Sequence, residues 1–214
     1  MEGRWIAHVP KYPGCFASSD DLATALDALP ACVRDYVAWR KESNLPIDPP
    51  TEPFVIDEQI RAWTIADIEV NAFFADDRLP LLMEELDEIR LLLQKTRVDL
   101  LEVAEGIEPQ KLSRKLEGER WPIAGVLSHV ARAEWWYLDR LGLSFDWEII
   151  PHDSFNRLSA AREHFYQALP SLGEVTGVRH PDGETWSPRK VIRRALWHER
   201  DHTQHISSLL ERMQ

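Results

Sequence analysis

Three of the eight histidines in this 214-residue chain fall within eight consecutive positions near its end. They are His198, His202 and His205. Ser187 followed by Pro188 is typical of a helix start, with the serine as N-cap and the proline in the first turn. Nothing after them breaks a helix before the end of the chain. The pattern therefore predicts one long helix that carries all three imidazoles.

These imidazoles lie on the face that an amphipathic helix buries. At about 100° per residue, they fall among the apolar side chains of the segment, which are Val191, Ala195, Ile206, Leu209 and Met213. Burying an imidazole costs free energy unless its nitrogens find partners. A metal ion is such a partner, and the i, i+4 spacing of His198 and His202 directs two rings to one point. Hydrogen-bonded core histidines without a metal ion are the alternative interpretation.

The metal hypothesis needs a ligand from outside this helix. His205 lies two turns, about 10 Å, from His198, whereas bonds from a zinc-like ion to imidazole are about 2.0–2.1 Å long. One ion is therefore not expected to bind all three. His129, in the middle of another predicted helix, is the best-placed further ligand, although it lies about 120° from the main apolar line of that helix.

A buried carboxylate is expected in the same helix as His129. Glu134 lies within about 20° of the apolar line, which points it into apolar surroundings. It either accepts a hydrogen bond from an arginine, tryptophan or histidine nitrogen, or it supports a metal-bound histidine.

Composition and charge argue against several classes of protein. The net charge of −11 and the pI near 5.2 argue against nucleic-acid binding, which needs clustered lysine and arginine. No stretch approaches 18 apolar residues, so no membrane span is expected. Two cysteines provide no disulfide framework, and the N-terminus has no apolar signal core. We therefore expect a cytoplasmic protein.

Hydrophobic periodicity predicts an all-α region over residues 80–214. Four segments there have one apolar face each, at about 82–105, 122–141, 154–172 and 188–213. They are expected to form an up-down four-helix bundle, in which facing helices build metal sites. Pro170 and Gly173 are expected to break the third helix. Residues 61–79 are expected to form a connector. The long apolar helices are compatible with a homodimer.

Residues 1–60 are predicted to form a small α+β module. Two short strands, at 4–9 and 15–17, precede a helix that Ser19 or Asp20 caps and that runs to about residue 39. The run Gly3-Arg4-Trp5-Ile6-Ala7-His8-Val9-Pro10, followed by Tyr12-Pro13-Gly14-Cys15 and an Ala/Leu-rich helix, resembles the HicB-like antitoxin domain. The resemblance implies a ββα-type module that binds a protein partner. The family's preceding strand and its DNA-binding element are missing here, and residues 54–56 or 63–70 could fill the open sheet edge.

The histidines stand in a specific sequence context. Ser128-His129-Val130, then Glu134-Trp135-Trp136-Tyr137, and His198-Glu199-x-x-His202 in the last helix resemble the DinB-like (DinB/YfiT) superfamily. In that family, one histidine of the second helix and an HxxxH pair of the last helix bind a divalent metal, usually zinc or nickel. The resemblance therefore implies His129, His198 and His202 as ligands. His205 stands where many members have glutamine, and it could donate to a ligand or replace His202.

These features favour a metal-dependent enzyme. Three neutral histidines leave at least one coordination position open, as catalytic sites do. The resemblance implies a thiol-dependent S-transferase acting with a low-molecular-weight thiol, and a hydrolase is also open, with Glu134 or His205 tuning the ion. The alternative is a protein-binding module in which the metal only staples the helices and there is no catalysis.

Overall fold

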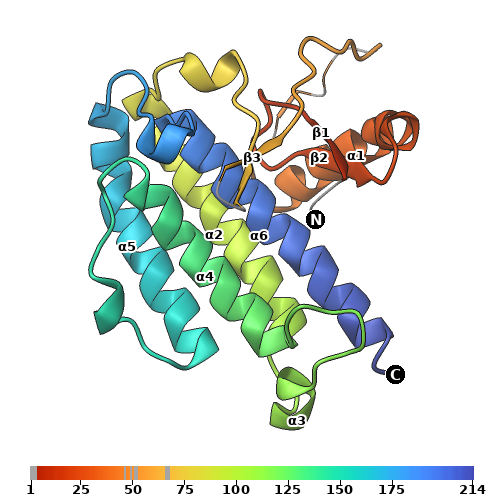
Figure 1. Ribbon diagram of the computed structural model, residues 1–214. Coiled ribbons are helices and arrows are strands. Elements are labelled where there is room, and N and C mark those ends of the chain that lie inside the picture. Colours follow the sequence, from red (N-terminus) through yellow and green to blue (C-terminus); the bar gives the residue numbers. More distant parts are fainter. Residues whose placement is uncertain (1–3, 46, 49, 51–52, 66–67) are drawn as a thin grey trace.

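The structure, a computed structural model, describes residues 4–45, 47–48, 50, 53–65 and 68–214. Four long helices pack together, and a smaller α+β region lies against one side of them (Figure 1). The long helices are α2 (Leu86–Ala104), α4 (Ile123–Asp139), α5 (Ser154–Glu174) and α6 (Pro188–Glu211). The chain therefore has the predicted order, an α+β region followed by a helical region.

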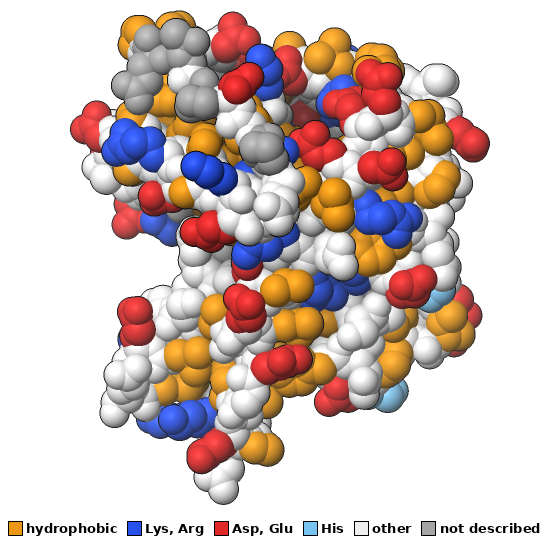
Figure 2. Space-filling model, turned by 180° about the vertical axis from the view of Figure 1, so that it is seen from behind, with side chains coloured by type: hydrophobic (Ala, Val, Ile, Leu, Met, Phe, Trp, Pro, Cys, Tyr) orange, Lys and Arg blue, Asp and Glu red, His pale blue; other side chains and the backbone are white. Residues whose placement is uncertain are grey.

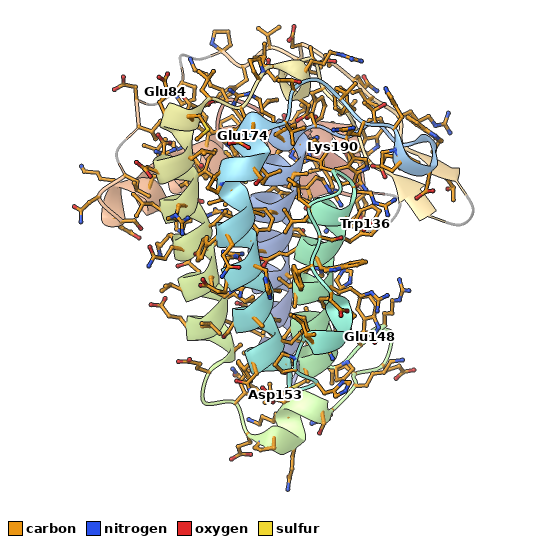
Figure 3. The ribbon with its side chains drawn as sticks, turned by 90° about the vertical axis from the view of Figure 1, so that its left-hand side faces the viewer. Glu84, Trp136, Glu148, Asp153, Glu174 and Lys190 are labelled. Carbon is orange, nitrogen blue, oxygen red and sulfur yellow. The ribbon has the colours of Figure 1, made fainter. Side chains whose placement is uncertain are left out.

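Two apolar cores hold the helical region together. Viewed from the side, α5 and α6 lie diagonally across from each other, and α2 and α4 each contact both of them (Figure 3). The first core includes Leu93, Phe165 and Leu196, and the second includes Leu100, Leu127 and Ile206. Full burial of one such side chain contributes roughly 1.5–3 kcal/mol. His198 and His202 come from the part of α6 between the two cores.

Apart from the helix of the N-terminal region, the remaining described helical segments are short. They are α3 (Pro109–Ser113) and single 3-10 turns at Asp76–Arg78, Met83–Glu85, Trp147–Ile149 and Pro181–Gly183. In the part of the chain that the structure describes, no helix is long and apolar enough to cross a membrane. On the face shown in Figure 2, lysines and arginines are scattered among aspartates and glutamates, so this face has no continuous basic surface.

Helix α5 continues through Pro170 to Glu174, which corrects the predicted break at Pro170 and Gly173. A proline inside a helix has no N–H for the carbonyl four residues earlier, which here belongs to Tyr166. Arg90 of α2 donates to this carbonyl oxygen instead, at 3.1 Å. Packing against α2 thus supplies a partner for the carbonyl that the proline leaves free.

The N-terminal region consists of a hairpin and a helix. Strand β1 (Trp5–His8) pairs antiparallel with β2 (Phe16–Ser19), and α1 (Leu22–Glu42) follows. Asp21 caps this helix, because its side chain accepts from the N–H of Thr24 at 2.9 Å. The strand–strand–helix order is as predicted, and the cap lies one residue beyond the predicted Asp20.

Neither candidate segment completes the sheet beside β1. Residues 54–56 form no strand, and β3 (Trp63–Ile65) pairs antiparallel with β4 (Ile68–Val70) in a hairpin of its own. Residues 66–67 of the predicted segment lie outside the described residues. A local hairpin closes a much shorter loop than pairing with β1 would, and its entropy cost is lower. Among the described strands, β1 therefore pairs with β2 alone.

Contacts to α2 and α6 attach the N-terminal region to the long helices. Trp39 of α1 donates from Nε1 to Oδ2 of Asp99 in α2 at 2.5 Å. Gly14, with φ of +87°, lies so close to α6 that a Cβ there would be 3.2 Å from Cβ of Leu196. A glycine is needed at this turn because it permits both the positive φ and the close approach.

Candidate metal centre

Helix α6 supplies two histidines to the centre. Ser187 caps the helix by accepting from the N–H of Lys190 at 3.1 Å, and Pro188 is its first residue, as the sequence predicts. His198 and His202 are only 5% and 2% exposed. The i, i+4 spacing therefore places both imidazoles in the interior, one helical turn apart.

Helix α4 supplies the third histidine, and an aromatic ring orients it. The ring of Trp121 stacks on the imidazole of His129, with centroids 4.6 Å apart and an interplanar angle of 30°. Gly125 lies one turn before His129, and a Cβ at this position would be 2.8 Å from Cβ of Trp121. Because that separation is shorter than Cβ atoms tolerate, the glycine permits Trp121 to lie against the helix and stack on the histidine.

The Nε2 atoms of the three imidazoles converge. Nε2 of His198 lies 3.1 Å from Nε2 of His129 and 3.1 Å from Nε2 of His202. One nitrogen from each ring lies within 4.8 Å of the other two. Two nitrogens bound to a tetrahedral ion at about 2.05 Å are about 3.3 Å apart. The two shorter separations therefore match the spacing that a common ion requires.

Hydrogen bonds alone satisfy this arrangement poorly. A neutral imidazole nitrogen offers either one N–H or one lone pair, whereas Nε2 of His198 faces two other Nε2 atoms. Nε2 of His198 can therefore form a well-aligned hydrogen bond with one of these two nitrogens, but not with both at once. A cation at the centre accepts one lone pair from each ring, so this donor set fits a metal ion better than a metal-free network.

Burial keeps these imidazoles neutral. It lowers the pKa of His129 to about 4, with smaller contributions from the charges of Arg120 and Arg194. It also lowers the pKa of His202 to about 3 and that of His198 well below its usual value. Neutral imidazoles present free lone pairs, which is the state that binds metals. A histidine that binds a metal usually donates its other ring N–H to a hydrogen-bond acceptor. Nδ1 of His202 differs, because it is buried without a hydrogen-bond partner among the described residues.

Glu134 faces two arginines. Its Oε1 accepts from Arg97 Nη2 at 2.9 Å and from Arg162 Nε at 3.0 Å. The same two arginines donate to Glu199, and Thr96 donates to Glu199 as well. Of the two alternatives for Glu134, the structure thus displays the arginine pairing.

His205 lies beside the centre but does not join the converging nitrogens. Its Nε2 contacts Oε2 of Glu119 at 3.0 Å, and Arg212 pairs with the other oxygen of this carboxylate. Both partners lower the pKa of Glu119, with Arg212 contributing more. The imidazoles of His202 and His205 are 5.8 Å apart, measured between centroids.

Sequence reasoning missed several residues around the centre. Arg97 and Arg162 were not expected to be buried, and no local pattern marks them as partners of Glu134. Arg194 was missed as well, although the sequence held a signal for it. Arg194 precedes His198 by four residues, so it shares a helix face with the metal-binding pattern.

A family model described as the DinB superfamily matches residues 92–206, more than half of the chain. The chain belongs to the DinB superfamily. The matched segment contains His129, His198 and His202 and leaves the N-terminal region outside, so the HicB-like resemblance stays a prediction. No curated protein and no solved structure matches this DinB-superfamily chain.

A cavity of about 620 Å³ lies apart from the histidine centre, in the N-terminal region. Residues of β1, the apolar side chains Leu22, Leu26 and Leu29 of the α1 region, and residues 53–60 line it. None of the three histidines does. The histidine centre and this cavity are therefore separate features of the molecule.

Proposed function

We propose that this DinB-superfamily protein is a metal-dependent enzyme. Its ion, zinc or nickel, is bound by Nε2 of His129, His198 and His202 inside an up-down four-helix bundle. The convergence of these nitrogens, with two separations of 3.1 Å, carries the proposal. The low pKa values of His129 and His202 support it, because no proton must leave before the ion binds.

Three protein ligands leave at least one coordination position for a substrate atom. A divalent ion held in this way supplies Lewis acidity toward a sulfur or oxygen donor. Trp121 fixes the ring of His129, and the burial of His198 and His202 excludes bulk water from their side of the ion. The reaction classes that fit are thiol-dependent S-transfer, with a low-molecular-weight thiol as substrate, and hydrolysis.

We assign no direct role in the chemistry to Glu134 or His205. The first is paired with Arg97 and Arg162, and the second is held by Glu119. Both residues then act on the centre only through the structure around it.

Metal analysis of the purified protein tests the ligand set. We expect about one zinc or nickel ion per chain, which the substitution His198→Ala or His129→Ala removes. His205→Ala is the matched control and keeps the ion, because His205 stands outside the converging nitrogens. A protein that holds no stoichiometric metal and does not respond to added zinc or nickel contradicts the proposal.

The second candidate function is protein binding by a HicB-like N-terminal module, with the ion serving only as a staple. The cavity beside β1 favours it, because an extended peptide could pair with an open strand edge and place side chains in the cavity. Metal removal by a chelator separates the two candidates. Loss of the helical circular dichroism on chelation favours the staple, whereas a folded metal-free protein favours the enzyme.

A further inference from the structure

Arg194 is a buried cation that has no anionic partner among the described residues. Its side chain lies on α6, and the residue is only 8% exposed. Nη1 donates to Oδ1 of Asn71, and Nη2 lies 3.5 Å from the hydroxyl of Tyr137. Nε is buried and has no hydrogen-bond partner among the described residues. No described carboxylate lies within ion-pair distance of this guanidinium.

Most other buried cations of the described chain have a carboxylate. The pairs are Arg40 with Glu88, Arg97 and Arg162 with Glu134 and Glu199, Lys190 with Glu184, and Arg193 with Asp77. An unpaired buried charge is costly, which explains why these pairs form. Arg200 also lacks such a pair, and both arginines lie over aromatic rings. Arg200 lies over the rings of Trp39 and Tyr36, at the contact with the N-terminal region, whereas Arg194 lies over the ring of Trp197, 4.4 Å from its centroid, beside the histidine centre.

The unpaired charge of Arg194 lies beside the histidine centre. Arg194 precedes His198 by one helical turn, so the two side chains share a face of α6. The phenol ring of Tyr137, which Arg194 approaches, meets the imidazole of His198 edge to face with centroids 6.0 Å apart. The charge of Arg194 also contributes to the lowered pKa of both His198 and His129. A divalent ion at the centre adds further positive charge to the same space.

The carboxylate that shares a face of α6 with Arg194 does not pair with it. Asp201 lies two turns further along the same face of α6, and the charge of Arg194 acts on it. It makes no ion pair with Arg194, however. A ligand that enters the centre therefore meets a metal ion and a guanidinium whose charges are not balanced by the chain.

We propose that the molecule bound at this centre carries a carboxylate, which pairs with Arg194 while a second donor atom occupies the open position on the ion. The inference rests on the proposed function, because it needs the ion at His129, His198 and His202. A guanidinium binds a carboxylate through two parallel hydrogen bonds, and the unpartnered Nε of Arg194 is one of the donors that such a pair uses. Arg194 is thus a positioning residue that selects among thiol substrates.

Two small thiols test this selection, because they offer the same sulfur donor and differ in charge. The wild-type protein is loaded with Co²⁺ and titrated with mercaptoacetate or with 2-mercaptoethanol, and the sulfur-to-cobalt absorption band reports binding. We expect mercaptoacetate to bind at least about tenfold more tightly to the wild type. Arg194→Met should reduce this preference by about the same factor and leave the affinity for 2-mercaptoethanol unchanged.

Two further variants control for charge and folding. Arg34→Met removes an exposed arginine of α1 and should keep the full preference. Arg194→Lys keeps the charge but not the paired donors, so it should show an intermediate preference. It also serves if Arg194→Met does not fold.

The outcomes separate the two proposals. A wild-type protein that takes up no cobalt, zinc or nickel overturns the metal centre and this inference with it. A cobalt-loaded Arg194→Met or Arg194→Lys variant with the wild-type preference overturns the role of Arg194 alone. In that case mercaptoacetate is preferred because it chelates the ion, and Arg194 makes no contribution.

Discussion

Two buried polar clusters meet on α6 at consecutive residues, His198 and Glu199, and they differ in completeness. Glu199 belongs to a cluster of two arginines and two glutamates whose charges balance and whose donors are nearly all used, in part on the carbonyls of Leu93 and Leu158. His198 belongs to a cluster of three neutral rings whose nitrogens face each other. The first cluster balances its charges within the chain and leaves only Oε2 of Glu134 without a hydrogen-bond partner among its described atoms, whereas the second, under the proposed function, needs a cation.

The difference shows how to separate structural from functional polar groups in a core. The arginines hold the pKa of Glu199 below its usual value, although burial alone would raise it. No anion does the same for His198, and burial lowers its pKa without opposition. A buried cluster that satisfies itself stabilises the fold, and one that does not is a candidate ligand site.

The largest expected effect comes from breaking the complete cluster. Arg162→Met leaves Glu134 and Glu199 with one arginine between them and should lower the free energy of unfolding by about 3–5 kcal/mol. Urea denaturation measures the change, with and without metal. Glu163→Gln, at the neighbouring exposed position on α5, should change stability by less than about 0.5 kcal/mol. An equally small effect of Arg162→Met would mean that the cluster does not hold the fold.

The opposite result is expected from the incomplete cluster. His198→Leu should abolish metal binding, yet in metal-free protein it should stabilise the fold by about 1 kcal/mol, because it removes a poorly satisfied buried imidazole. Urea denaturation in the presence of a chelator measures this. Destabilisation comparable to that of Arg162→Met would erase the distinction between the two clusters.

The stability of the metal-free protein should depend on pH because the histidine cluster is buried and neutral. The pKa values of His129 and His202 in the folded protein, about 4 and about 3, lie below the value of 6.5 for an unperturbed histidine. Between these lowered pKa values and 6.5, the unfolded chain binds more protons than the folded protein. The free energy of unfolding should therefore fall as the pH decreases below about 6.5. Above it, these groups contribute no pH dependence.

Melting temperatures between pH 7.5 and 5, measured with a chelator, test this expectation. A flat profile in that interval would contradict neutral, buried histidines. Replacing His129 and His202 by leucine should reduce the slope by about half, because the pKa values of His198 and His8 are lowered by burial as well.

The smallest expected effect concerns the orientation of one ring. Gly125→Ala would place a Cβ 2.8 Å from that of Trp121 and should displace the indole from His129. We expect metal affinity to fall several-fold while the fold persists, with zinc competition against a chelating dye as the measurement. Gly118→Ala is a poor control because its φ is positive, so Ser128→Ala in α4 serves instead. Equal affinities of the Gly125→Ala and Ser128→Ala variants would show that the stacking is dispensable.

Local sequence patterns predicted the helices well because these patterns act over a few residues. The start of α6 follows from Ser187 and Pro188, and the shared face of His198 and His202 follows from their spacing. The continuation of α5 through Pro170 could not be predicted in this way. It depends on Arg90 of another helix, which binds the carbonyl that the proline leaves free.

The sequence by itself determined that α6 buries two imidazoles one turn apart, because helical periodicity is a local property. Only the tertiary structure decided that His129 meets them. His129 lies away from the main apolar line of α4, and its side chain reaches His198 because α4 packs against α6. The tertiary structure also paired Glu134 with two arginines and left Arg194 without a carboxylate. Partners far apart in sequence are chosen by the packing of helices against each other, which no single segment encodes.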